Sequence, residues 1–180
     1  MFLESGDEIP TERFIQTRIE AEIAFCMKGP LAGEVTREEV LQATDYVFPS
    51  LEILDTRIFR KDENTGKMRT VFDTISDNAA NAGVISGVQK NDPQKFDLRR
   101  VGSIVMRNNE VEETGLGAGV LNDPITGIIW LVKRLSEYNQ KISPGEIILS
   151  GSFIRPIEAR KGDEFYADFG DFGFVECKFN

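Results

Sequence analysis

A chain of 180 residues is long enough to bury the core of one domain and short for two, so we expect a single domain over residues 1–180. With 41% hydrophobic and 28% charged residues, the composition excludes a disordered protein. The formal net charge of −9 argues against a surface for nucleic acid or anionic membranes. Partners are therefore expected to be small molecules, metal ions or other copies of the chain. The first residues lack the basic and apolar regions of a signal peptide, so we expect a cytoplasmic protein.

The first strong pattern predicts a strand over 18–27, where polar and apolar residues alternate. Side chains in a strand alternate between faces, so Glu20 and Glu22 project together while the apolar residues between them pack on the other side. An E-x-E pattern is also typical of the solvated face of an amphipathic strand. The pattern alone leaves two alternatives open, a solvated strand face or a site at which both carboxylates provide oxygen donors.

A capping box follows, with Thr36 three residues before Glu39. Together with the helical spacing of the apolar residues behind it, this box predicts a helix over 37–46. We expect Pro49 to end this element before the next strand begins.

That next strand carries Glu52 between two aliphatic residues. A carboxylate embedded in this way costs several kcal/mol unless it is paired or binds a cation. An ion pair with Arg57 or Arg18 is one solution. The other joins Glu52 to the two glutamates of the first strand. Three hard oxygen donors in a chain without histidine suit Mg²⁺ or Mn²⁺ better than zinc.

The middle of the chain is rich in polar and small residues. Residues 61–67 predict a loop or an excursion of the chain over the site, and residues 73–83 predict a tightly packed turn or short helix near a site. A capped helix start with Ser76 or Asp77 as N-cap is the alternative for this second segment.

The second half predicts a hairpin over 97–119 with its turn at Asn108-Asn109. Asp123-Pro124 opens a helix with one apolar stripe, and Trp130 lies beside the centre of that stripe, at a packing edge or an oligomer contact. A buried strand at 147–149 and two final strands around 165–169 and 174–179 complete the pattern. Cys26 and Cys177 lie in apolar runs and are expected to be reduced and to face the core.

These elements predict an α+β protein, mainly β, with a few helices. Without histidine, a Ser-His-Asp or Cys-His pair is excluded, and no P-loop or EF-hand spacing is present. What remains is metal-assisted chemistry on a small anionic ligand.

The chain resembles the fumarylacetoacetate hydrolase superfamily, and within it the hydratases of 2-oxohept-3-ene-1,7-dioate and 2-keto-4-pentenoate. Four ordered matches carry the resemblance: 18–25, 43–47 with 51–57, 71–83 and 145–156. The resemblance implies a rolled, mixed β-sheet of the kind found in the C-terminal domain of that superfamily. It also implies a homo-oligomer, and a hydratase that adds water to a 2-hydroxy-2,4-dienoate through its 2-oxo tautomer, giving a 4-hydroxy-2-oxo acid in aromatic catabolism.

The resemblance further implies roles for single residues. Glu20, Glu22 and Glu52 correspond to the ligands of Mg²⁺ or Mn²⁺, which binds the 1-carboxylate and 2-oxo oxygens of the 2-oxo-enoate substrate. Ser152 corresponds to a hydroxyl that contacts the substrate carboxylate, Asn78 to a polar lining group, and Arg155 to a partner for a distal carboxylate. A surface ion pair between Arg155 and Glu158 is equally compatible with the residues alone.

The resemblance places a further segment ahead of the position of Met1, with a lysine and an acidic residue that transfer protons beside the metal. General acid–base steps of this kind contribute ~10²–10⁴ in rate. The expectation is therefore an N-terminally shortened catalytic domain whose activity depends on those groups. The alternatives are a decarboxylase or C–C hydrolase of the same superfamily, and a non-catalytic paralogue that binds metal or keto acid.

Overall fold

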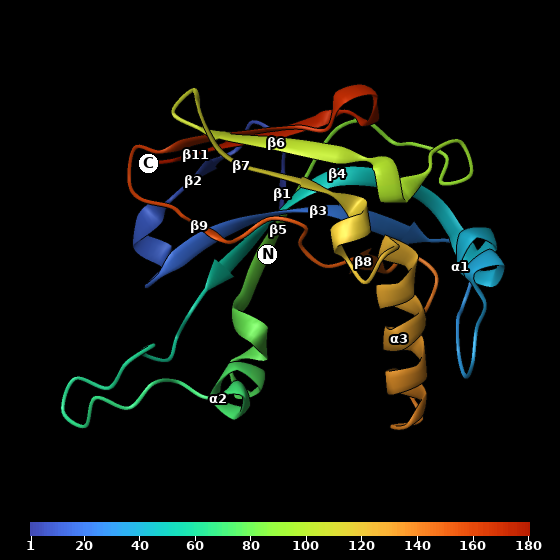
Figure 1. Ribbon diagram of the computed structural model, residues 1–180, viewed down its shortest axis with the longest axis horizontal. Coiled ribbons are helices and arrows are strands. Elements are labelled where there is room, and N and C mark those ends of the chain that lie inside the picture. The colour runs from blue at the N-terminus through green and yellow to red at the C-terminus, as the bar shows by residue number, and fades with distance from the viewer.

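Two β-sheets lie one above the other in the computed structural model, which describes residues 1–180 (Figure 1). The first sheet has six strands in the order β1-β5-β4-β3-β8, with β9 also paired to β3. These strands are β1 (Phe2–Glu4), β3 (Thr17–Met27), β4 (Thr44–Asp55), β5 (Asn81–Ser86), β8 (Ile147–Leu149) and β9 (Ile157–Glu158).

The second sheet has five strands in the order β2-β11-β10-β6-β7. They are β2 (Glu8–Ile9), β6 (Gly102–Arg107), β7 (Glu110–Leu116), β10 (Glu164–Asp168) and β11 (Phe174–Phe179). In each sheet one pair of strands is parallel, β1 with β5 and β2 with β11, and the other pairs are antiparallel. The prediction of a mainly β fold with mixed sheets is confirmed.

The hydrophobic core lies between the two sheets. Ile19, Ala21 and Ile23 of β3 are fully buried and belong to one cluster with Phe165 of β10 and Val175 of β11. Because side chains alternate along a strand, the even-numbered residues of β3 project from the opposite face, away from the second sheet.

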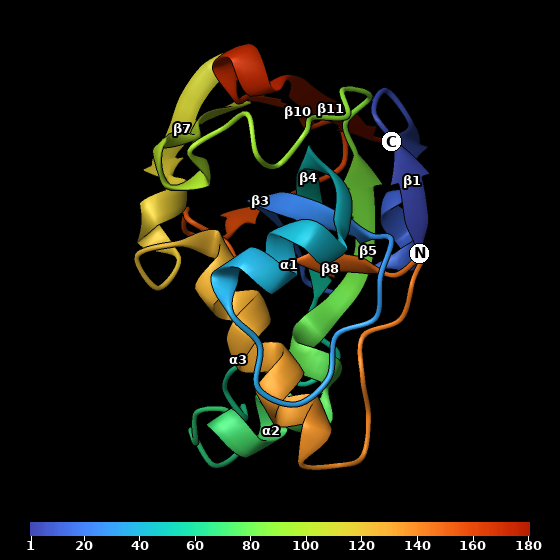
Figure 2. The same cartoon turned by 90° about the vertical axis from the view of Figure 1, so that its right-hand side faces the viewer.

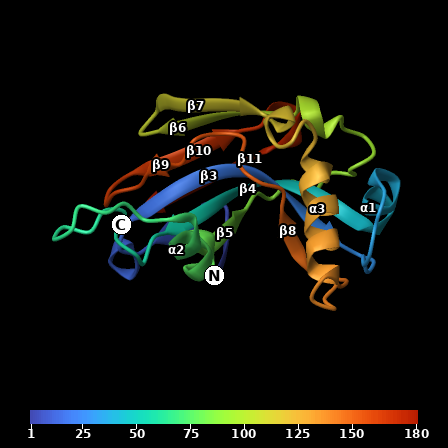
Figure 3. The same cartoon turned by 60° about the horizontal axis from the view of Figure 1, so that its bottom comes forward.

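Three α-helices complete the fold: α1 (Arg37–Ala43), α2 (Val71–Ser76) and α3 (Pro124–Ser136). α2 and α3 extend from the six-stranded sheet on the side away from the five-stranded sheet (Figure 1, Figure 2 and Figure 3). Asp123 caps α3, which buries Ile125, Ile128 and Val132. No helix is long and apolar enough to span a membrane.

The predicted boundary between the first helix and the second strand is wrong. The capping box of Thr36 and Glu39 is present, but α1 ends at Ala43, and Pro49 lies inside β4. The carbonyl of Pro49 accepts a hydrogen bond from the backbone N–H of Gly87, beyond the last residue of β5. In an antiparallel strand, the backbone N–H and C=O of one residue point to the same side. The N–H that Pro49 lacks would therefore face the end of β5, and its absence removes no ladder bond to β3.

The segment 73–83 contains the short helix that is one of its two predicted structures. The alternative of a helix start capped by Ser76 or Asp77 is wrong, because the N-cap of α2 is Thr70 and both residues lie at its end. Most of α2 is exposed. A 3-10 turn, Asn78–Ala80, connects α2 to β5.

Most later elements agree with the sequence, but β8 is only half-buried, so its prediction as a buried strand is wrong. Asn108 and Asn109 have φ values of 54° and 67°, as a two-residue hairpin turn of type I′ requires. Both cysteines are free, and Cys177 is buried as predicted. Cys26 is only half-buried and belongs to the even-numbered face of β3, which points away from the core, so its prediction as a core residue is wrong.

Candidate metal centre

Three glutamates meet on the face of the six-stranded sheet that points away from the core. β3 and β4 are antiparallel neighbours, and their register places Glu20 directly opposite Glu52 and Glu22 opposite Ser50. Each glutamate offers one carboxylate oxygen, and these oxygens all lie within 4.8 Å of one another. The structure therefore brings together the three side chains that the sequence singled out.

Neutral groups hold two of these carboxylates. Glu22 accepts a hydrogen bond from the backbone N–H of Gly151 at 2.7 Å, and Glu52 accepts one from the side-chain amide of Asn81 at 2.6 Å. The predicted alternative of an ion pair is wrong, because Arg57 pairs with Asp77 and neither Arg57 nor Arg18 forms a salt bridge with Glu52.

The alternative of a solvated strand face is also wrong for Glu22, which is only 3% exposed. Burial raises the pKa of Glu22 well above its usual range, and the negative charge of Glu52 adds to the effect. Burial and the same neighbour raise the pKa of Glu20 to about 7, against a smaller opposing effect of Arg18. Three carboxylates so placed repel one another unless protons or a cation compensate them.

The donor set fits a hard divalent cation. All three donors are carboxylate oxygens within 4.8 Å of one another, and no histidine or cysteine joins them. Mg²⁺ and Mn²⁺ prefer such ligands, whereas zinc favours nitrogen and sulfur. The residues present therefore suit the ion that the sequence predicted.

Ser152 lies beside this cluster but is engaged with the backbone. Its hydroxyl donates to the carbonyl of Ile154 at 2.9 Å and lies 3.4 Å from the carbonyl of Ala21, the residue between Glu20 and Glu22. Its role toward substrate stays a prediction. The sequence did not single out its neighbour Gly151, because the contribution of that residue is a backbone N–H.

Arg155 and Asn78 make no hydrogen bond to the three carboxylates. Arg155 is exposed and pairs with Glu113, with Nη2 and Oε1 2.7 Å apart, so the alternative of a surface pair with Glu158 is wrong. Asn78 is exposed and lies in the left-handed turn after α2. The amide that reaches the cluster belongs to Asn81, and the substrate roles of Asn78 and Arg155 stay predictions.

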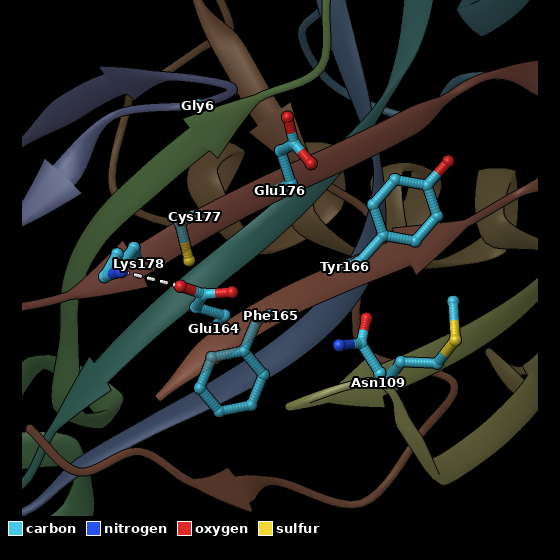
Figure 4. Close-up of a pocket in the computed structure, with 9 residues that line it drawn as sticks. Gly6, Asn109, Glu164, Phe165, Tyr166, Glu176, Cys177 and Lys178 are labelled. Atoms are coloured by element: carbon cyan, nitrogen blue, oxygen red, sulfur yellow. Dashed lines mark hydrogen bonds and ion pairs between the residues drawn. The ribbon is translucent and has the colours of Figure 1, made fainter. Parts of the chain in front are cut away.

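The main cavities lie elsewhere. One of about 490 Å³ opens on the outer face of the five-stranded sheet, where Tyr166 and Glu176 lie beside the ion pair of Glu164 and Lys178 (Figure 4). None of the five main cavities is lined by the three glutamates. The chemistry and convergence of its ligands, and not an enclosing cavity, identify the candidate metal centre.

The chain is similar in sequence to two proteins that are named as hydratases. The chain is 50% identical to 2-oxo-hept-4-ene-1,7-dioate hydratase of Escherichia coli over 180 residues, which cover 99% of this chain and 67% of that protein. It is 35% identical to 2-keto-4-pentenoate hydratase of Paraburkholderia xenovorans LB400, over 97% of this chain and 63% of that protein. No family model matches the chain.

Among solved structures, 4-oxalocrotonate decarboxylase from Pseudomonas putida G7, complexed with magnesium and adipate, has the same fold. The TM-score is 0.90 at 29% identity, over 99% of this chain and 66% of that chain. The chain thus spans about two thirds of the length of the proteins that it matches.

Proposed function

Because the chain belongs to the hydratase family of the fumarylacetoacetate hydrolase superfamily, we propose that it forms the metal-binding part of a Mg²⁺-dependent hydratase. The substrate class is 2-oxohept-3-ene-1,7-dioate or a similar 2-hydroxy-2,4-dienoate, and the product is a 4-hydroxy-2-oxo acid formed in aromatic catabolism. A cytoplasmic location and a homo-oligomer are part of the proposal.

The convergence of Glu20, Glu22 and Glu52 carries this proposal. These residues would hold Mg²⁺ or Mn²⁺, which when bound polarises the 2-oxo group of a keto acid and offsets the charge of its carboxylate. The name of the solved decarboxylase supports this assignment, because that protein is complexed with magnesium and a dicarboxylate, adipate.

The chain's own groups prepare the centre for a cation. Gly151 and Asn81 donate hydrogen bonds to Glu22 and Glu52, so each keeps one carboxylate oxygen engaged. Neither donor carries a positive charge that would compete with the cation. For Ser152 we propose the contact to the substrate carboxylate, because its hydroxyl lies beside the backbone that separates Glu20 from Glu22.

An ultraviolet assay tests this function. With 2-hydroxyhepta-2,4-dienedioate and Mg²⁺, we expect loss of the diene absorbance that EDTA stops and that the double variant Glu20→Ala and Glu22→Ala abolishes. Calorimetry on the same proteins should show that the unaltered chain binds Mg²⁺. The affinity of the double variant for Mg²⁺ should fall by more than the ~10–100-fold that is typical of changes outside the ligand set.

The matched control is Glu176→Ala, which removes an exposed glutamate from a strand of the other sheet. It should leave both readouts unchanged. Mg²⁺ binding without turnover would favour the non-catalytic paralogue, whereas absence of Mg²⁺ binding by the unaltered chain would refute the metal centre.

A decarboxylase is the second candidate function. The TM-score of 0.90 to 4-oxalocrotonate decarboxylase favours it, since the two proteins share the fold over almost the whole chain. Product analysis separates the two reactions, because decarboxylation releases CO₂ and hydration releases nothing. Cleavage of the substrate into two smaller carbon-containing products would instead indicate a C–C hydrolase.

A further inference from the structure

Asn81 reaches Glu52 because of an irregularity in β5. In the regular part of the β4–β5 pairing, Glu52 lies opposite Val84 and Ile53 opposite Gly83. The register then shifts, so that Leu54 lies opposite Asn81 and one residue of β5 is left unpaired. Such a bulge turns the following side chain to the other face of a sheet. Asn81 therefore shares a face with Glu52, and its Nδ2 lies 2.6 Å from Oε1 of Glu52.

The turn that enters this bulge is strained. Three consecutive residues, Asn78, Ala79 and Ala80, have φ values of 51°, 53° and 65°. These values lie in the left-handed region, which is unfavourable for residues other than glycine. A run of such residues persists only where surrounding contacts hold it, and such runs are concentrated at functional sites.

Arg57, two residues beyond the end of β4, supplies those contacts. Its guanidinium donates to the carbonyl of Asp77 at 2.8 Å and to the carbonyl of Asn81 at 3.3 Å, the residues on either side of the left-handed run. Its Nε donates to Oδ1 of Asp77 at 2.6 Å, and its backbone N–H donates to Oδ2 at 2.9 Å. The side chain of Asp77 is only 4% exposed, and Arg57 holds its pKa below the usual range.

From this chain of contacts we infer that Arg57 and Asp77 are positioning residues for the metal centre, which act through the Asn81 amide on Glu52. The inference rests on the proposed function, since it concerns a ligand of the proposed cation. Because Arg57 forms its salt bridge with Asp77, its positive charge is not paired with Glu52. Glu52 is therefore oriented by a neutral donor, and no positively charged side chain occupies the place of a cation beside it.

The test is the Mg²⁺ affinity of Asn81→Ala, measured by calorimetry beside its thermal unfolding midpoint. We expect Mg²⁺ to bind about 10- to 100-fold more weakly, as is typical when a group that orients a ligand is removed. The matched control is Asn180→Ala, which removes the same kind of amide-to-glutamate hydrogen bond, to Glu8, at the end of the chain. It should bind Mg²⁺ like the unaltered protein.

Arg57→Lys provides a second, conservative variant in case the turn fails to form without Asn81. It keeps a positive charge beside Asp77 but cannot serve both carbonyls, so Mg²⁺ affinity should fall by several-fold. Arg99→Lys is its control, because Arg99 forms a similar pair with Asp97 on the surface. It should leave the affinity unchanged.

The outcomes separate the inference from the proposed function. If the unaltered chain binds Mg²⁺ and both Asn81→Ala and Arg57→Lys bind it equally well, the positioning role is overturned while the metal centre stands. If the unaltered chain does not bind Mg²⁺, the proposed function fails, and the inference fails with it.

Discussion

Glu22 is the carboxylate whose surroundings define the site at the scale of single residues. It is buried, it accepts a hydrogen bond from Gly151, and it lies beside two further glutamates with only neutral donors on them. A protein gains no stability from this arrangement in the absence of a cation, because burial and mutual repulsion both disfavour the charged forms. The cluster is therefore more readily explained by ligand binding than by folding.

The first prediction concerns the stability of the metal-free protein. Burial raises the pKa of Glu20 from 4.5 to about 7, so the folded protein binds more protons than the unfolded chain between these values. The free energy of unfolding should therefore fall as the pH rises from 4.5 to about 7. The chain contains no histidine to mask the effect.

Urea denaturation in EDTA at several pH values measures this slope. Glu20→Gln removes the titrating group, so the variant should lose part of the slope and keep the remainder that Glu22 contributes. A flat profile for the unaltered protein would contradict the burial of these carboxylates.

At the scale of elements, α3 controls the loop that supplies the hydrogen bond to Glu22. Gly127 lies where α3 passes this loop, and a Cβ at this position would stand 2.8 Å from the carbonyl oxygen of Ser150. Gly151, the next residue, donates to Glu22. Close approach of helix and loop thus depends on the absence of a side chain at Gly127, a requirement that only the tertiary structure reveals.

The second prediction follows for Gly127→Ala. Alanine favours a helix over glycine by about 1 kcal/mol, but the collision with Ser150 should outweigh this gain and destabilise the protein by about 1–3 kcal/mol. The displaced loop should also weaken Mg²⁺ binding through Gly151. Thr126→Ala, at the exposed neighbouring position, is the control and should be neutral or stabilising. Chemical denaturation and calorimetry provide both readouts.

At the scale of the whole molecule, the surface carries apolar side chains on both helices that flank the centre. Phe72 and Ile75 of α2 are 76% and 67% exposed, and Trp130 of α3 is 61% exposed. Apolar patches of this kind mark interaction surfaces in soluble proteins. The homo-oligomer expected from the sequence stays a prediction, and these residues are where it can be tested.

The third prediction is concentration-dependent self-association. Replacing Phe72 and Ile75 by serine should shift sedimentation toward smaller species if α2 forms the contact. Trp130→Ser tests α3 separately. A sedimentation coefficient that is independent of concentration and equal to that of a monomer in all three proteins would refute the expected oligomer.

The sequence by itself determined the strand that carries Glu20 and Glu22, the hairpin at Asn108-Asn109 and the capped starts of α1 and α3. These features depend on side-chain alternation and local capping, which act over a few residues. The same alternation placed both glutamates on one face, and the absence of histidine restricted the metal.

Only the tertiary structure decided that Glu52 lies opposite Glu20, because strand register depends on pairing between distant segments. It also placed Pro49 inside β4, showed the amide of Asn81 on Glu52 in place of the alternative ion pair, and added the backbone of Gly151. A β-bulge or a backbone N–H donor can occur at almost any residue type, so composition and spacing cannot reveal them.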